Sequence, residues 1–444
     1  MKKLRSVIHA SLATLAIIST TALHAEQPAQ IPLPKIERKS MLNGMQVLFL
    51  DAEGDRSPFL LMIQNGAAFD PVDKWGVTYL MTRIPVDKWG VTCLMTRMLM
   101  DQLAEADYLS EFQTKGIQVH ATTDWDAIFI EGSAPPQELE FALQTLGEIL
   151  ARPKFDQDVF DRLRAELVEE LKKLDRDPEF QSETLFTSRI FQENPYGHPV
   201  RGTVKTVSNL YLRDVLIQAR RLLLPNGWVQ EKSLPFTFRQ ATPPSEPQIA
   251  LLNAPVDGKC FVRWGYLGVE KSSRDYLTFK VLEQYLTLAM PDWAQEVQDA
   301  NHIRGYAQCV ARRMPGFLQI SIETQPKYAP AYVGKFLSAM DRLRTGPIDE
   351  KRFNEAKSLV LQEFVKSLAD PEARIREILT SELYGVGLGF IPTFPLRLER
   401  VTPEVFQRAV SEQFPDKSYV AVIVSPGADM DSRLGQFGRV EVLN

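Results

Sequence analysis

The chain has few residues that could hold a catalytic metal ion. Of its five histidines, His120, His198 and His302 lie beyond the N-terminal apolar segment. A catalytic zinc takes about three protein ligands and keeps one position open for water, and two histidines four residues apart on a helix can supply two of them. No two of these three histidines have that spacing. The sequence therefore contains no pair of helical histidines from which a zinc site could be built.

Other groups that could do chemistry are better explained by structure. His198 lies in a Pro-Tyr-Gly-His-Pro turn, where a structural role is expected, and His120 lies in a predicted strand, where packing is expected. Glu166, Glu169 and Glu170 form the acidic face of a predicted helix, and such faces are most often solvated. The sequence contains neither a glycine-rich phosphate loop nor a Gly-x-Ser-x-Gly elbow, which argues against nucleotide chemistry and serine hydrolysis.

Cysteine usage gives no disulfide framework. The chain has three cysteines, Cys93, Cys260 and Cys309, at unrelated spacings. Export would permit a disulfide, but a framework needs an even set at regular spacings. We expect buried free thiols, with a Cys260–Cys309 disulfide as the alternative.

The N-terminus has the features of a secretory signal peptide. Lys2, Lys3 and Arg5 precede an apolar stretch from Val7 to about Ala22, and the segment ends in Ala-Leu-His-Ala at residue 25. This order predicts a signal peptide over residues 1–25 and export to the periplasm of a two-membrane bacterium. The apolar run is shorter than a bilayer span needs, and no later segment is apolar enough to cross a membrane. The net charge is -5 with no stripe of lysine and arginine, which argues against nucleic acid as a partner.

An internal repeat predicts the domain organisation. Residues of one segment recur 193 positions later without a gap, so that Asp156, Phe160, Glu170, Asp177, Pro178 and Glu179 are followed by Asp349, Phe353, Glu363, Asp370, Pro371 and Glu372. A constant offset over so many positions indicates duplication of a whole domain. We expect an N-terminal domain over residues 32–234, a proline-rich linker over 235–247, and a C-terminal domain over 248–444.

The pattern of expected elements is α+β. Strands are predicted at 45–50, 59–64, 117–122, 127–132 and 419–425, and helices at 104–115, 138–151, 157–174, 179–192 and after 208. Strands come in pairs and helices in runs, which is typical of α+β and not of alternating βαβ units. We expect two duplicated domains, each an antiparallel sheet with helices packed on one face.

The order of several short motifs resembles the pitrilysin/insulinase family of zinc peptidases. The motifs are Leu42-Asn43-Gly44-Met45, Asn65-Gly66-Ala67, Asn194-Pro195-Tyr196-Gly197-His198-Pro199, Arg344-Thr345-Gly346-Pro347-Ile348 and Glu399-Arg400-Val401-Thr402-Pro403. The resemblance runs from about Pro32 to Ser425. It implies two α+β domains that join another such pair to enclose a chamber for peptides. Active members carry an inverted zinc motif, H-x-x-E-H, and a further glutamate downstream.

At the matching helix this chain departs from the family. Cys93, Thr96 and Arg97 stand where the motif has histidine, glutamate and histidine, and Glu170 matches the downstream glutamate. Arginine stays protonated and cannot ligate a cation, and one carboxylate cannot hold zinc. We therefore expect no bound metal or other cofactor and no catalytic residues.

A second departure concerns the substrate. Catalytic partners in this family that lack the zinc motif often supply an arginine and a tyrosine seven residues apart. Asn301 and Gln308 stand at those positions here. Arg304 and Tyr306 lie close by, and they are the candidates for binding substrate.

A tandem copy affects the alignment at the zinc motif. Residues 71–83 are repeated almost unchanged as residues 85–97, with Tyr79 replaced by Cys93. Because the repeat length of fourteen residues is close to four helical turns, one copy can loop out without reversing the helix face.

These observations predict a non-catalytic homologue of zinc peptidases. The first hypothesis is the structural, substrate-enclosing subunit of a periplasmic heterodimer, with a zinc-bearing homologous peptidase subunit and peptides as partners. The second is a metallopeptidase that acts on peptides in its own right. The third is a peptide-binding, chaperone-like protein that works without any partner.

Overall fold

The computed structural model describes residues 31–41, 45–50, 54–69, 88–104, 106–223, 239–299, 304–426 and 430–443. The predicted signal peptide, the first tandem copy and the predicted linker up to residue 238 lie outside these ranges. None of the helices in the described ranges combines the length and the apolar character that crossing a bilayer requires.

The first half of the chain contains one three-stranded antiparallel sheet and a hairpin. The sheet has the order β3-β5-β4 and the hairpin joins β1 to β2. The strands are β1 (Ile36–Ser40), β2 (Gln46–Leu50), β3 (Ser57–Gln64), β4 (Gln118–Thr123) and β5 (Ala127–Ala134). The helices are α1 (Val91–Asp101), α2 (Ala106–Thr114), α3 (Leu139–Ala151), α4 (Gln157–Leu174), α5 (Pro178–Phe191), α6 (Val204–Ser208) and α7 (Leu212–Leu222).

The second half contains a six-stranded sheet with the order β11-β6-β10-β7-β9-β8. Its strands are β6 (Gln248–Asn253), β7 (Cys260–Leu267), β8 (Arg304–Val310), β9 (Phe317–Thr324), β10 (Val420–Ser425) and β11 (Arg439–Leu443). Its helices are α9 (Tyr276–Val297), α10 (Ala329–Thr345), α11 (Glu350–Ala369), α12 (Pro371–Leu383), α13 (Phe390–Glu399), α14 (Pro403–Gln413) and α15 (Met430–Leu434). The fold is thus α+β, as the sequence predicted. The sheet itself is mixed and not purely antiparallel, because β6 runs parallel to both β10 and β11.

The two halves repeat the same order of elements around their sheets. In each half a strand is followed by a helical segment (α1 and α2 in the first half, α9 in the second) and then by two strands, and the spatial order β3-β5-β4 matches β7-β9-β8. The helix starts also correspond. Asp177 caps α5 by accepting a hydrogen bond from the backbone N–H two residues on, and Asp370 caps α12 in the same way. These two aspartates are 193 residues apart, the offset of the sequence repeat.

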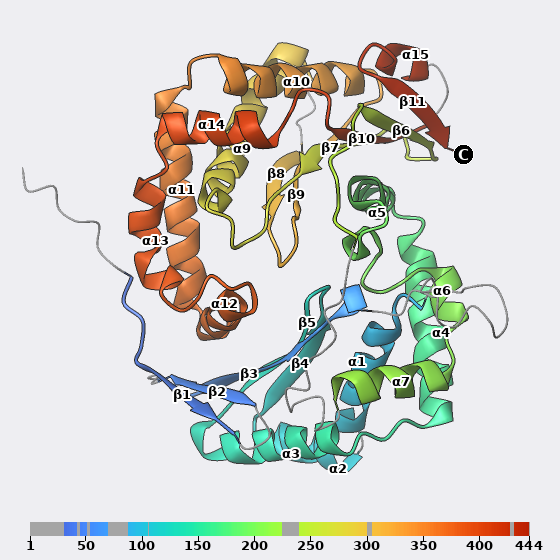
Figure 1. Cartoon of the computed structure of the whole chain (residues 1–444). Helices are drawn as coiled ribbons and strands as arrows, with labels where there is room; N and C mark the ends of the chain where they lie inside the picture. Colours follow the sequence, from blue (N-terminus) through green and yellow to red (C-terminus); the bar gives the residue numbers. More distant parts are fainter. Residues whose placement is uncertain are drawn as a thin grey trace, which may run out of the picture.

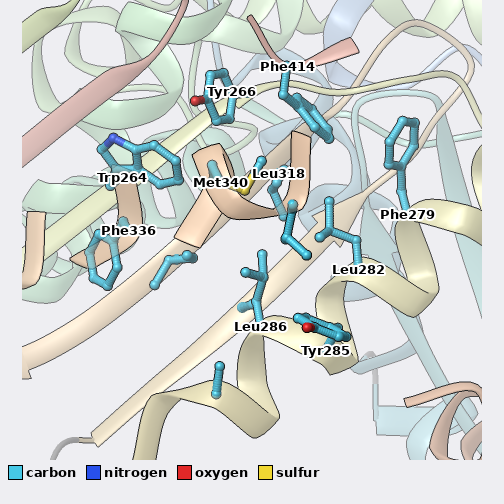
Figure 2. Close-up of a cluster of buried hydrophobic side chains, with 14 of the residues drawn as sticks. Trp264, Tyr266, Phe279, Leu282, Tyr285, Leu286, Leu318, Phe336, Met340 and Phe414 are labelled. Atoms are coloured by element: carbon cyan, nitrogen blue, oxygen red, sulfur yellow. The ribbon is translucent and has the colours of Figure 1, made fainter. Parts of the chain in front are cut away.

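The main core lies in the second half, between one face of the six-stranded sheet and α9, α10, α11 and α14. Figure 2 shows Trp264 and Tyr266 of β7, Leu318 of β9 and Leu282 of α9 meeting there. Alternate residues of β7 point into this core because side chains alternate between the two faces of a strand. The apolar residues of α9 recur every three or four positions, which places them on the helix face that covers the sheet.

Helices α5 and α12 each pack on the sheet of the other half (Figure 1). α5 packs on β7 and β10, and α12 packs on β3 and β5. Phe186, Ile190 and Phe191 of α5 join the valines of β10 in a second apolar cluster. The expectation of helices on only one face of each sheet is therefore wrong. The six-stranded sheet is covered on both faces, and the three-stranded sheet has α12 on one face and α1 and α3 on the other.

Candidate functional site

Helix α1 carries the residues that match the zinc motif. Its first seven residues belong to the second of the two tandem copies, and Gly90 precedes it with a φ of 92°, in the left-handed region. A Cβ at this position would lie 2.5 Å from the carbonyl oxygen of Arg201, so only glycine fits. The helix packs between β4 on one side and α7 on the other. Gln218 of α7 donates a 2.8 Å hydrogen bond to the hydroxyl of Thr92, which fixes the rotation of α1.

Cys93 and Thr96 are both buried, with 8% and 4% of their surfaces exposed. The Thr96 hydroxyl donates to the Thr92 carbonyl oxygen at 2.9 Å and accepts from the Thr123 hydroxyl of β4 at 3.0 Å. Thr96 stands where a peptidase of this kind would have its general base, and a neutral threonine hydroxyl is too weakly basic to accept a proton from water.

Arg97 forms a two-pronged ion pair with Glu170 of α4. Its Nη1 atom donates to Oε1 at 2.9 Å and its Nη2 atom donates to Oε2 at 2.7 Å. The hydrogen bond from Arg97 lowers the pKa of the Glu170 carboxyl, and the same bond raises the pKa of the guanidinium. Both groups are therefore ionised over the whole working range of pH. The Arg97 guanidinium thus binds the carboxylate of Glu170, the residue that matches the third metal ligand of the family.

This arrangement does not fit a zinc ion. The carboxylate that matches a ligand already binds a fixed cation, Cys93 is buried and interacts with the same Arg97 side chain, and the Thr96 hydroxyl bonds to Thr92 and Thr123. A zinc ion would meet a positive charge in place of a ligand. Elsewhere in the described residues, no group of three histidine, cysteine, aspartate or glutamate side chains is placed to hold a metal.

Two of the three histidines can be placed. His198 is buried and stacked on Trp89 with ring centroids 5.0 Å apart, and burial lowers its pKa to about 4. Its role is structural, as its turn motif predicted. His120 lies on β4 with its Nε2 atom 3.0 Å from Oε1 of Glu131. His302 lies outside the described residues.

The two candidate substrate-binding residues lie on β8, at the edge of the second sheet. Arg304 and Tyr306 are exposed and share one face of the strand. The Tyr306 hydroxyl accepts a 3.4 Å hydrogen bond from Nη1 of the buried Arg263. Gln308, on the same face, accepts from Gln319 at 2.9 Å. Asn301 lies outside the described residues.

A groove of about 590 Å³ runs beside Arg97. It is lined by α1, by β4 and by the α2 region, and its wall is mainly apolar. The apolar lining includes Met100, Leu103, Leu109, Phe112 and Val119, and the polar lining is Thr96, Arg97, Gln113, Gln118 and His120. Among the described strands β4 pairs only with β5, so its other side is an edge at which backbone groups can receive an extended chain.

Sequence reasoning missed the polar contacts that join the two halves. Tyr196 donates a 2.6 Å hydrogen bond to the buried carboxylate of Asp126 and accepts one of 3.2 Å from the backbone N–H of Met314. Beside it Arg312 pairs with Asp124 at 2.6 Å. The Asn-Pro-Tyr-Gly-His-Pro motif was visible in the sequence, but nothing in it indicated which residue the tyrosine would contact.

A second such contact lies on the inner face of the first sheet. Arg376 of α12 forms an ion pair with the buried Glu131 of β5, and the same carboxylate contacts His120. The guanidinium also lies over the ring of Phe129, 4.4 Å from its centroid. The repeat predicted α12 but not its position against the other half.

The three cysteines are free thiols, so Cys260 and Cys309 form no disulfide. Burial raises the pKa of Cys260 to about 12 and that of Cys309 well above its ordinary value. Both thiols are protonated and unreactive at neutral pH.

A profile of the insulinase family (peptidase family M16) matches residues 47–204. The matched residues make up about a third of the chain, and over them the chain is similar to this family. The expected resemblance is confirmed.

Individual relatives are distant in sequence and similar in fold. A peptidase M16 inactive domain from Pseudomonas fluorescens has a TM-score of 0.73 at 17% identity, covering 88% of this chain and 98% of that one. A protease from Helicobacter pylori has a TM-score of 0.77 at 14% identity, covering 89% and 100%. Cytochrome b-c1 complex subunit 1 of Caenorhabditis elegans mitochondria is 23% identical over 179 residues, which is 40% of this chain and 35% of that protein. The match thus spans about a third of that relative.

Proposed function

We propose that this chain is a non-catalytic member of the insulinase family that forms the structural, substrate-enclosing half of a heterodimer with a zinc-bearing homologous chain. The observation that carries the proposal is the Arg97–Glu170 ion pair. It places a permanent cation of the protein at the carboxylate that an active member would offer to zinc. A chain of this fold without its metal site keeps the surfaces of a peptidase but lacks its chemistry.

Two comparisons support this role. One structural neighbour is described as an inactive domain of the family, and one sequence relative is described as a subunit of a larger complex. The groove beside Arg97 and the free edge of β4 would give the chain a surface for an extended peptide. Export to the periplasm, expected from residues 1–25, belongs to the same proposal.

We also infer that the two halves arose by duplication of one domain, with boundaries near residues 32–234 and 248–444. The matching strand orders, the two aspartate caps at the repeat offset, and the reciprocal packing of α5 and α12 support this inference. A duplicated domain that packs in this way forms one half of a shell and leaves the other half to a partner of the same kind.

The test is a peptidase assay on separate and combined chains. The partner is a chain of the same organism that carries an intact H-x-x-E-H motif, and the control is that partner with its motif glutamate changed to glutamine. We expect chelator-sensitive cleavage only when the active partner is combined with this chain. Chelator-sensitive cleavage by this chain alone would overturn the proposal in favour of a metallopeptidase in its own right. Peptide binding by the lone chain without any association would favour a chaperone-like role.

A further inference from the structure

Helix α7 carries an unusual outward face. Its buried side packs on α1 through Val215, Ala219 and Leu222. Its outward side contains Arg213, Leu216, Ile217 and Arg220, at positions i, i+3, i+4 and i+7, which form a single stripe on a helix. We call these four residues together with Tyr211 the α7 stripe.

The apolar side chains of the α7 stripe are largely exposed to solvent. Tyr211 is 56% exposed, Ile217 52% and Leu216 38%. Within the described residues these are three of ten exposed large apolar side chains, and the other seven lie on other elements, so exposed apolar area is concentrated on this helix. Clustered apolar side chains at a surface indicate a site of contact.

The charge of the stripe is positive. Neither Arg213 nor Arg220 forms an ion pair with a described carboxylate. Arg213 instead lies over the ring of Tyr211, 5.0 Å from its centroid. The one acidic residue of α7, Asp214, turns inward and pairs with Lys88 at 2.9 Å. The outward side of α7 therefore presents cations and apolar groups together, on a chain whose net charge is -5.

A shallow hollow of about 390 Å³ lies at the start of the same helix. Its lining includes Arg164, Tyr211 and Arg213. Arg164 is held in place by a hydrogen bond to the Leu210 carbonyl oxygen and by an ion pair with Asp161. The hollow is open to solvent at the end of the stripe, and an anionic group on the stripe would reach it.

We propose that the α7 stripe docks this protein on an anionic lipid surface. A stripe on the outward face of a single helix can lie flat on a plane. Leucine, isoleucine and tyrosine enter the boundary between headgroups and acyl chains, while arginines bind the phosphates. Because only a few residues take part, binding is reversible. Because arginines bind the phosphates, binding weakens as salt is added.

The test uses the full mature chain and vesicles of defined lipid. Co-sedimentation is measured with vesicles of phosphatidylglycerol mixed with phosphatidylcholine and with vesicles of phosphatidylcholine alone, at low and high salt. We expect binding only to the anionic vesicles, weakened by salt, and reduced about tenfold or more in the variant Arg213→Glu/Arg220→Glu. The control variant Arg274→Glu/Arg439→Glu makes the same change of charge at two exposed arginines elsewhere, and it should bind like the wild type.

A second measurement reports insertion directly. Ile217→Trp should gain fluorescence quenching by lipids with brominated acyl chains, above the level of the wild-type tryptophans, and Leu216→Ser/Ile217→Ser should bind more weakly without a change of charge. Equal binding to neutral vesicles, equal loss in the control variant, or capture of the stripe by an acidic protein without lipid binding would each overturn the proposal.

Discussion

The guanidinium of Arg97 and the carboxylate of Glu170 face each other through two parallel hydrogen bonds, and they join α1 to α4. The pair links two helices that a metal ion would link in an active relative. Arg97 stands at a ligand position and neutralises Glu170, so the carboxylate does not lie unpaired beside α1.

The first prediction concerns the metal. After dialysis the wild-type chain should contain no stoichiometric zinc by elemental analysis. The triple variant Cys93→His/Thr96→Glu/Arg97→His removes the cation and supplies two imidazoles beside Glu170, so it should bind about one zinc per chain. Adding Glu170→Gln to the triple variant should weaken that binding. Peptidase activity of the triple variant alone should stay low, because Gln308 and not an aromatic side chain stands at the expected substrate position. A stoichiometric zinc in the wild type would contradict the prediction.

The second prediction concerns the ion pair itself. A double-mutant cycle of Arg97→Ala and Glu170→Gln, followed by chemical unfolding, should give a coupling free energy of about 0.5–1 kcal/mol, since the Glu170 side chain is 44% exposed and solvent screens the pair. The folded-state pKa of Glu170 is lowered, so the coupling should be present above the unfolded pKa of glutamate and lost as the pH falls through the folded value. A cycle for Arg162 and Glu166, an exposed pair on α4, serves as the control and should give less.

The sequence predicted much of the first half because its elements depend on local signals. α4 begins and ends at the predicted residues, since an aspartate precedes it and apolar residues recur through it at helical spacing. The degenerate metal positions were found for the same reason, as they are set by spacing along one helix. That Arg97 would reach Glu170 was not predicted. The signal available in the sequence was that the replaced ligand position carries an arginine and the retained position carries a glutamate, which have opposite charges.

Contacts between the halves could not be predicted in this way. Tyr196 and Met314 are 118 residues apart, and Glu131 and Arg376 are 245 apart. No periodicity relates such residues, because their meeting depends on how α5 and α12 cross to the opposite sheets. The parallel pairing of β6 was missed for a similar reason, since it depends on where β10 returns to the sheet.

The third prediction concerns His198. Its folded-state pKa is about 4, below the ordinary value of 6.5, because the buried ring disfavours the charged form. Below about pH 6.5 the unfolded chain binds a proton that the folded chain does not, so stability should fall by about 3 kcal/mol between pH 6.5 and pH 4 from this group. His198→Phe should keep a ring against Trp89 and remove that part of the pH dependence. His120→Asn, at an exposed histidine, should leave it in place. An unchanged slope in His198→Phe would contradict the assignment.

The fourth prediction concerns the Tyr196 hydroxyl, which bonds to Asp126 of the first half and to the backbone of Met314 in the second. Tyr196→Phe leaves the buried Asp126 carboxylate without its 2.6 Å donor, and we expect a loss of about 2 kcal/mol in the free energy of unfolding at neutral pH. Burial already raises the pKa of Asp126, and removing the hydroxyl raises it further. The folded chain then holds a proton that the unfolded chain has lost, so the deficit should shrink as the pH falls. Tyr211→Phe removes a hydroxyl from an exposed tyrosine and should change stability little.

The fifth prediction concerns the tandem copy. Deleting residues 71–84 joins Asp70 directly to Pro85 and keeps Cys93, whereas deleting residues 84–97 joins Arg83 to Met98 and keeps Tyr79 in its place. The two products are identical in sequence except for that one position. α1 and its described contacts come from the second copy, so the first deletion should leave the midpoint of thermal unfolding within about 2 °C of the wild type.

The second deletion tests the packing of α1 at that same position. It places a tyrosine where Cys93 is 8% exposed, and overpacking there should cost about 1–3 kcal/mol. Thermal unfolding of both variants, compared with each other and with the intact chain, separates the two effects. A loss of several degrees in the first deletion would mean that residues 71–84 contribute to the core. Equal stability of the two deletions would mean that the position of Cys93 tolerates a large side chain and that α1 does not pack as described.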